Sequence, residues 1–276
     1  MKKISRRSFM AAAAVSVAAL AMTACGGSAS SAASSVASSA ASSEAVSSAA
    51  DLTTVEAGKL TMATNATFPP YEMTTDSGEI EGIDVDTAKA IAEKLGLELQ
   101  IDDMDFDAAL LSVQQGKADI VMAGVTVTDE RKAVMDFSDS YATGIQSIIV
   151  PNDSDIASPD DLADKKIGTQ RGTTGYIYCS DDFGEDSVVA YDSGLTAVQA
   201  LNNGQVDAVV IDNAPATEYV AANPGLKVLD TSYAEEDYAI GMAKGSALED
   251  AVNKALEELK ADGTLQAIVD KYINAN

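Results

Sequence analysis

Arg131 is the residue whose position first suggests binding chemistry. It follows Thr128, which can cap a helix, and two acids in the first turn, where the helix dipole favours negative charge and gives a cation no advantage. A guanidinium has a planar fork that can hold a carboxylate through two parallel hydrogen bonds. The alternative is an arginine solvated on a helix face or paired with Asp136 or Asp139. Arg131 is therefore a candidate anchor for a carboxylate.

A second candidate, Asp212, ends the apolar run Ala208–Ile211, which reads as a buried strand. An acid there is costly unless it has a positive partner or water, so it can receive a cationic group. The alternative is an N-cap for a helix over 213–222. The segment Gly172–Gly175 precedes a helix near Tyr176, whose free N–H groups would form an anion site unless the segment is a plain turn.

The stretches around these candidates alternate between strand-like and helix-like patterns. Strands are expected at 59–64, 98–103, 119–122, 145–150, 166–170, 208–212 and 238–242, and helices at 84–95, 106–115, 160–165, from 176, 194–203, 213–222, 248–259 and 265–272. This alternation indicates parallel βαβ units and an α/β fold. In open parallel sheets, ligands bind beyond the carboxyl ends of the strands.

Three loops should therefore converge on one crevice: 65–71, the stretch before Phe106, and 124–131. The first loop carries Phe68 and Tyr71 beside two prolines, and Gly124 permits the close backbone approach that a ligand needs. Each aromatic residue could instead belong to the core. Their shared placement at loop starts favours ligand contact.

The N-terminus reads as an export signal. Four basic residues precede the apolar run Phe9–Met22, which is too short for a stable membrane anchor, and Met22–Cys25 resembles a lipobox with Met in place of the commoner Leu. We expect a signal peptide over 1–24 and a lipid on Cys25. The paired arginines fit a twin-arginine signal or an ordinary secretory one. Residues 26–50 are almost all Ser, Ala and Gly, and predict a tether spanning about 25 to 30 Å.

Charge and cysteine content exclude several functions. The formal charge is −25, and without the first 24 residues 14 basic residues face 43 acidic ones, which gives −29. Such a surface repels phosphate backbones, so we expect no nucleic-acid partner. The chain has two cysteines and no histidine, so Cys179 has no disulfide partner if Cys25 carries lipid, and no histidine to activate it as a nucleophile. We expect no metal, no cofactor and no enzyme activity.

Four segments together resemble the family 3 solute-binding proteins, which bind polar amino acids for ABC importers. They are ATNATFPPYE, EGIDVDTAKAIAEKLG, MDFDAALLSVQQGKADIVMAGVTVTDERKAVMDFSDSY and RGTTGY, within a match from about residue 58 onward. The resemblance implies a periplasmic-binding-protein-like fold: two lobes, each a mainly parallel sheet flanked by helices, joined by a two-strand hinge. Lobe 1 would comprise 56–149 and 239–276, lobe 2 would comprise 150–238, and 25–55 would be the lipidated linker.

The resemblance also implies roles for individual residues. Arg131 would fork the ligand α-carboxylate, helped by the backbone amide of Thr173, and Asp212 would take the α-ammonium. The remaining site residues would be the Gly124 carbonyl and Thr126 hydroxyl at the ammonium, the aromatics Phe68, Phe106 and Tyr71 around the side chain, and Asn65, Gln170 and Ile211 at its end. Closure of the lobes would then follow ligand binding.

The preferred side chain of the ligand is predicted from a position at which this sequence differs from the family pattern. Relatives that bind basic amino acids often carry an acid where this chain has Asn65, so a polar uncharged L-amino acid is favoured. The expected protein is a monomer anchored by lipid to the outer face of the bacterial membrane, delivering its ligand to ABC permease subunits. The alternatives are an enzyme on the same fold, such as a dehydratase, and a surface sensor or adhesin.

Overall fold

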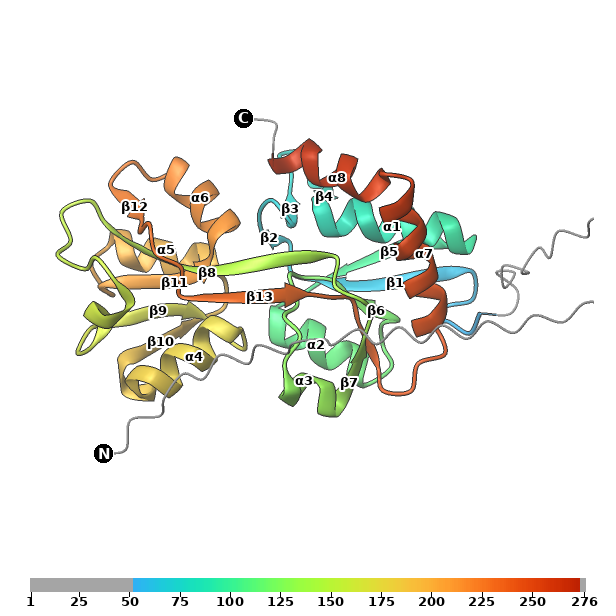
Figure 1. Cartoon of the computed structure of the whole chain (residues 1–276), viewed down its shortest axis with the longest axis horizontal. Helices are drawn as coiled ribbons and strands as arrows, with labels where there is room; N and C mark the ends of the chain where they lie inside the picture. The colour runs from blue at the N-terminus through green and yellow to red at the C-terminus, as the bar shows by residue number, and fades with distance from the viewer. Residues whose placement is uncertain (1–51, 274–276) are drawn as a thin grey trace, which may run out of the picture. The chain divides into compact units, whose positions relative to one another are not determined.

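A computed structural model describes residues 52–273 of the chain (Figure 1). The predicted signal peptide, the predicted lipidation site Cys25 and nearly all of the predicted linker lie outside the described residues. Within 52–273, no helix has the length and apolar character needed to cross a membrane.

Lobe 1, as we use the term from here, is built on a five-stranded sheet of order β5–β1–β6–β14–β7. Its strands are β1 (Lys59–Thr64), β5 (Glu98–Asp103), β6 (Ile120–Val121), β7 (Met135–Phe137) and β14 (Gly241–Ala243), and its helices are α1 (Ile83–Leu95), α2 (Phe106–Gln114), α3 (Asp129–Val134), α7 (Glu249–Ala261) and α8 (Thr264–Ile273). The first three strands are parallel, and β14 runs antiparallel to both of its neighbours. A small sheet of β2 (Thr67–Phe68), β3 (Glu72–Thr74) and β4 (Ile80–Glu81) lies beside them.

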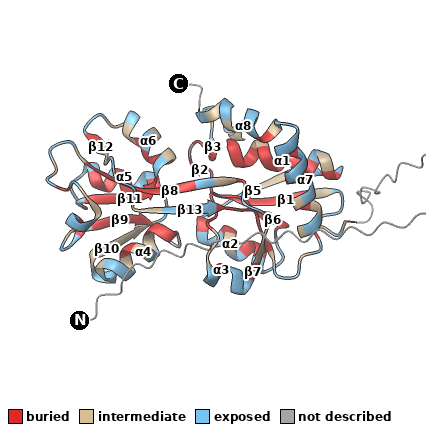
Figure 2. Cartoon of the chain, viewed as in Figure 1, coloured by how far each residue is buried: buried red, intermediate tan, exposed pale blue. Residues whose placement is uncertain are grey.

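Helices cover this sheet on two sides. Helices α1, α7 and α8 pack together, whereas α2 packs on β1, β6 and β14 within a separate hydrophobic cluster. Helix α1 shows why the sequence folds this way: Val85, Ala88, Ile91 and Leu95 repeat at helical spacing and are all buried, and Gly96 ends the helix in the left-handed conformation with φ 70°. Buried residues accordingly concentrate on the strands and on the helix faces that meet them (Figure 2).

Lobe 2 is built on a second sheet of order β10–β9–β11–β8–β12, with β13 also paired to β8. Its strands are β8 (Ala142–Pro151), β9 (Ile167–Gln170), β10 (Val188–Tyr191), β11 (Ala208–Asp212), β12 (Leu226–Val228) and β13 (Ala234–Tyr238), and its helices are α4 (Thr174–Phe183), α5 (Gly194–Asn202) and α6 (Asn213–Ala221), with single helical turns at Pro159–Leu162 and Glu185–Ser187. Strands β10, β9 and β11 are parallel, and the other pairings are antiparallel. The predicted α/β fold with two lobes is confirmed.

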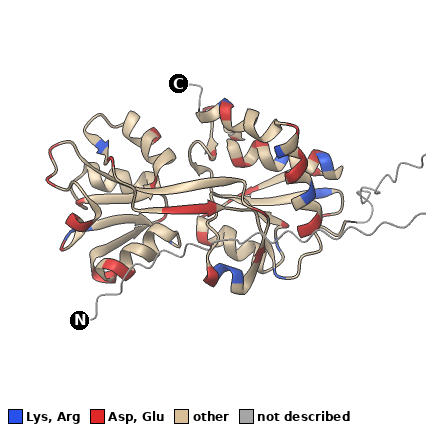
Figure 3. Ribbon diagram, in the orientation of Figure 1, with Lys and Arg blue, Asp and Glu red and all other residues tan. Residues whose placement is uncertain are grey.

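Two long strands connect the lobes. Strands β8 and β13 run antiparallel, with Ala142 opposite Tyr238 and Gln146 opposite Ala234 (Figure 1). The predicted return strand over 238–242 is wrong in its position, because β13 ends at Tyr238 and β14 begins at Gly241. The acid-rich sequence of β13, AEEDY, hid the strand, since it has little apolar character (Figure 3).

Candidate ligand-binding site

A cavity lies where loops that follow strands of both lobes meet, as expected for α/β sheets. Nine of the ten predicted ligand-binding residues line it: Asn65, Phe68, Phe106, Gly124, Thr126, Arg131, Gln170, Thr173 and Asp212. Lobe 1 supplies the first six and lobe 2 the last three. The structure therefore brings together residues that are separated by up to about 150 positions in the chain.

The Arg131 guanidinium is buried at the lobe 1 side of the cavity, with 9% of the residue exposed. Thr128 caps α3 by accepting the Arg131 N–H at 3.2 Å, which fixes where the side chain starts. Its Nη1 donates to the Thr126 carbonyl at 2.7 Å, and its Nη2 donates across the lobes to the Gly172 carbonyl at 3.1 Å. The guanidinium carbon lies 5.4 Å from the centre of the Phe106 ring.

Arg131 has no carboxylate partner within 4 Å among residues 52–273. Asp136, one proposed alternative partner, instead pairs with Lys244 at 2.6 Å. Burial lowers the pKa of Arg131, and the Glu236 carboxylate partly opposes that change. A guanidinium has five N–H donors, and protein carbonyls take two of them here. The others remain able to fork a carboxylate ligand.

Asp212 occupies the lobe 2 side of the cavity at the end of β11. It stands at the N-cap position of α6, but its side chain makes no capping hydrogen bond. Its Oδ2 accepts from Gln146 Nε2 at 2.7 Å and its Oδ1 accepts from the Tyr238 hydroxyl. Burial raises the pKa of Asp212 to about 7, and Glu236 adds to the rise, while the Tyr238 and Gln146 hydrogen bonds oppose it. No cation in residues 52–273 pairs with this carboxylate, and a ligand ammonium would supply one.

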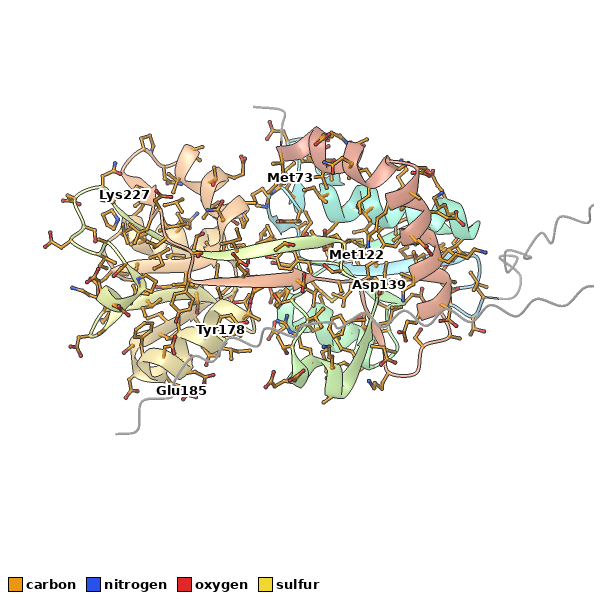
Figure 4. All side chains as sticks on the ribbon, viewed as in Figure 1. Met73, Met122, Asp139, Tyr178, Glu185 and Lys227 are labelled. Carbon is orange, nitrogen blue, oxygen red and sulfur yellow. The ribbon has the colours of Figure 1, made fainter. Side chains whose placement is uncertain are left out.

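Glu236 is a buried acid next to this site that the sequence reasoning missed. It lies on β13 and accepts from Thr126 Oγ1 at 3.1 Å and from Gln146 Nε2 at 3.0 Å. Tyr178 of α4, labelled in Figure 4, also faces it, and burial followed by the Glu236 charge raises the pKa of Tyr178 to about 12. The two strands that connect the lobes thus place polar groups beside Asp212: β8 carries Gln146, which donates to both acids, and β13 carries Glu236. A lone amide in the apolar strand ATGIQSIIV was the available signal for Gln146.

The aromatic residues divide between cavity and core. Phe68 and Phe106 line the cavity, and Gly124 lies directly beneath Phe68, since a Cβ at Gly124 would be 2.7 Å from Phe68 Cε1. Tyr71 lies outside the cavity lining. Its ring stacks on Phe68 at 5.6 Å and meets Tyr238 edge-on at 5.4 Å. Tyr71 therefore supports the aromatic wall from behind.

Polar groups also line the cavity away from Arg131. Gln170 Nε2 donates across the lobes to Asn65 Oδ1 at 2.9 Å, and Asn65 Nδ2 donates to the Met104 carbonyl at 2.8 Å. Glu72 lines the same cavity and is fully buried, and no described residue donates a hydrogen bond to either of its carboxyl oxygens. The sequence reasoning missed Glu72, although it ends the quoted segment ATNATFPPYE.

Further contacts join the two lobes around the cavity. The hydroxyls of Thr126 and Thr174 lie 3.5 Å apart, and the Tyr219 hydroxyl donates to the Thr67 carbonyl. Thr173 caps α4 by accepting the Tyr176 N–H at 3.3 Å, and its own amide points to the Gln170 carbonyl at 3.4 Å. In residues 52–273, no cluster of three or more histidine, cysteine, aspartate or glutamate side chains could hold a metal ion.

Known proteins resemble this chain over most of its length. A profile of the bacterial extracellular solute-binding proteins, family 3, matches residues 60–275. A probable histidine-binding protein of Neisseria gonorrhoeae is 34% identical over 270 residues, which cover 95% of this chain and 94% of that protein. The L-cystine-binding protein TcyJ of Escherichia coli strain K12 is 33% identical over 225 residues, which cover 80% and 85%.

Solved structures of amino-acid-binding proteins also match this chain. The arginine-, lysine-, histidine-binding protein ArtJ of Geobacillus stearothermophilus matches with a TM-score of 0.75 and 34% identity, covering 79% of this chain and 96% of that one. An ancestral arginine-binding protein bound to glutamine matches with a TM-score of 0.75 and 43% identity, covering 78% and 98%. Membership in such a family implies an extracytoplasmic location. This chain belongs to the bacterial extracellular solute-binding proteins of family 3.

Proposed function

We propose that this protein binds a free L-α-amino acid between its lobes and delivers it to the permease of an ABC importer. One observation carries the proposal: a buried guanidinium from lobe 1 and a buried carboxylate from lobe 2 line the same cavity. A zwitterion is the small molecule whose two charges match that pair. The names of the amino-acid-binding relatives support the same class of ligand.

The ligand α-carboxylate would lie against Arg131, and the α-ammonium would lie against Asp212. The ammonium favours the ionised form of Asp212 and would lower the pKa of that carboxyl from about 7. Because Arg131 and Asp212 belong to different lobes, a ligand that contacts both stabilises the closed arrangement over an open one. A permease that recognises the closed arrangement would therefore dock the loaded protein.

Hydrogen-bond donors in the ligand side chain would suit the rest of the cavity. The predicted preference for a polar uncharged side chain fits the Asn65 and Gln170 amides, which a ligand amide can match. Glu72 is a buried acceptor to which no residue of the described part of the chain donates, and it favours a side chain rich in N–H groups, whether an amide or a cation. A similar ancestral arginine-binding protein was solved with glutamine, which has an amide side chain, and with arginine, which has a cationic one. A cationic side chain is thus the second candidate.

Anchoring would keep the protein near its permease. We propose that Cys25 carries a lipid, that the segment up to residue 55 is a tether, and that the protein acts as a monomer at the outer face of the membrane. Radiolabelled fatty acid should be incorporated by the wild-type protein and not by the Cys25→Ala variant. Incorporation by both proteins would rule out Cys25 as the lipidation site.

A thermal-shift screen tests the binding proposal. Purified protein is unfolded, dialysed and refolded to remove carried-over ligand, and is then melted with each of the twenty amino acids and cystine. A ligand at 100 times its dissociation constant stabilises the folded state by about 2.7 kcal/mol, which gives a clear upward shift. Stabilisation by one or a few amino acids supports the proposal. Absence of any shift, or recovery of a chemically altered ligand, contradicts it.

A further inference from the structure

Two carboxyl groups lie together at the wall of the cavity, with Glu72 in its lining and Asp84 behind it. Glu72 begins β3 and Asp84 stands in the first turn of α1, and both are fully buried. Asp84 Oδ2 accepts the Gly124 N–H at 2.9 Å, and the Tyr141 hydroxyl also faces Asp84. Glu72 faces the cavity on one side and Asp84 on the other. The pair therefore links the cavity wall to the loop after β6 that carries Gly124.

Within residues 52–273, no lysine or arginine compensates the charge of this pair. The charges acting most strongly on Glu72 belong to acids on three neighbouring elements, and tyrosine hydroxyls complete its surroundings: Asp84, Asp103, Asp212, Tyr71, Tyr141 and Tyr219. Arg131, the cation of the cavity lining, is directed toward the Thr126 and Gly172 carbonyls. Two adjacent buried carboxylates cannot both be ionised at modest cost.

The hydrogen bonds indicate which member keeps the proton. Burial and the neighbouring Asp84 carboxylate raise the pKa of Glu72 well above its usual range. Burial also raises the pKa of Asp84, but only to about 6, because the Gly124 N–H donates to its ionised form at 2.9 Å, whereas no residue in 52–273 donates a hydrogen bond to the Glu72 carboxyl. Asp84 is thus the member that ionises more readily, and Glu72 is the member that keeps the proton.

We propose that the Glu72–Asp84 pair holds one proton in the ligand-free protein, and that an amino acid with a cationic side chain displaces this proton into solvent on binding. The inference rests on the proposed function and adds a regulation by pH to the same site. The incoming cation takes the place of the proton beside the Glu72 carboxylate, so the buried charge stays balanced. An uncharged amide side chain would donate its N–H to the carbonyl oxygen of the protonated Glu72 and leave the proton in place.

The consequence is a pH-dependent choice of ligand. Displacing one proton makes the affinity for a cationic amino acid rise about tenfold per pH unit, as long as the pH lies below the pKa of Glu72 in the ligand-free protein. Asp212 can also lose a proton when an ammonium binds, but it does so for every amino acid. The difference between a cationic and an amide ligand therefore isolates Glu72.

Isothermal titration of the refolded protein measures this difference. L-arginine and L-glutamine are each titrated at about pH 7 in phosphate and in Tris, whose ionisation enthalpies differ, so that the dependence of the observed heat on the buffer counts the protons released. We expect L-arginine to release about one proton more than L-glutamine. Below the raised pKa of Glu72, the L-arginine affinity should rise about tenfold per pH unit relative to that of L-glutamine, and the rise should level off above that pKa.

Two variants assign the proton. Glu72→Gln keeps the shape of the side chain and should remove the extra proton and weaken L-arginine binding more than L-glutamine binding. Glu79→Gln, which changes an exposed acid in the same hairpin, should behave like the wild type. Equal proton release for both ligands, an extra proton that persists in Glu72→Gln, or binding of L-glutamine without L-arginine would overturn the inference and leave amino-acid binding intact.

A ligand-free measurement separates the resident proton from the binding function. A carboxyl whose pKa is raised by folding stabilises the protein at low pH, and this contribution is lost as the pH rises toward the raised pKa. The melting temperature of Glu72→Gln should therefore gain on that of the wild type as the pH rises from the ordinary carboxyl pKa toward the raised pKa of Glu72. A constant difference over this range would refute the proton on Glu72 even if no amino acid binds.

Discussion

Replacing Arg131 is the most direct perturbation of the proposed site. In Arg131→Ala the cavity loses its guanidinium and the ligand carboxylate would be buried against the Thr126 and Gly172 carbonyls without a cation. Arg131→Lys keeps the charge but has a single ammonium in place of the fork, so it cannot reach both carbonyls and grip a carboxylate bidentately. We therefore expect affinities in the order wild type, Lys variant, Ala variant.

The magnitude follows from the burial of this residue. With 9% of Arg131 exposed, its charge pair with the ligand would be desolvated, and truncating such a pair costs about 2 to 5 kcal/mol. This is about 30-fold to several thousandfold in the dissociation constant. The two carbonyls that lose their donor cost folding stability separately, by about 1 to 3 kcal/mol for each buried group. Titration calorimetry measures the first effect and urea unfolding without ligand measures the second.

Arg171 provides the matched control. Among residues 52–273 the arginines are Arg131 and Arg171, and the second is half exposed and pairs with Asp192 at 3.5 Å on the surface of lobe 2. Arg171→Ala should bind amino acid as the wild type does, since exposed ion pairs contribute little. Tight binding by a folded Arg131→Ala variant would refute the assignment of the carboxylate anchor, as would equal losses in both variants.

Other consequences can be measured on the same protein. Folding raises the pKa of Asp212 to about 7 from about 3.9, so ligand-free stability should fall as the pH rises from 4 to 7, and Asp212→Asn should melt higher than the wild type at pH 8 while losing amino-acid affinity by calorimetry. Gly124→Ala should lower unfolding free energy by about 1 to 3 kcal/mol more than Gly116→Ala in urea titrations, because both have positive φ but only the first places a Cβ against Phe68. Cys179 should react with a thiol reagent only after unfolding, because burial raises the pKa of that thiol to about 12.

The predictable part of the site was its charged residues at the end of a strand or the start of a helix. β11 was expected over 208–212 and has these bounds, and Arg131 follows a helix cap that the structure contains. In both cases a local pattern predicts the backbone conformation. The charge is unexpected in that pattern, because Asp212 ends a buried apolar strand and Arg131 is a cation at a helix N-terminus. The local patterns thus singled out Arg131 and Asp212 separately, and the resemblance to the family was what assigned both to one site.

The missed residues owe their burial to distant segments. Glu236 belongs to a run of acids that reads as surface, and only pairing of β13 with β8 turns it and Tyr238 inward. Glu72 follows two prolines and reads as a loop, and α1 is what covers it. The expected preference for an uncharged ligand used Asn65 without knowledge of Glu72, so it stays a prediction.

The route of the chain through the two sheets has a consequence for the order of folding. All strands of lobe 2, from β8 to β13, are contiguous in sequence, whereas in lobe 1 strand β14 inserts between β6 and β7, about a hundred residues after β7 has emerged. Domains fold as units as the chain is delivered from its N-terminus. Lobe 2 can consequently reach its native topology while lobe 1 is an unfinished sheet. The Arg131 half of the cavity then matures last, and the ligand cannot lock the protein before its final strand arrives.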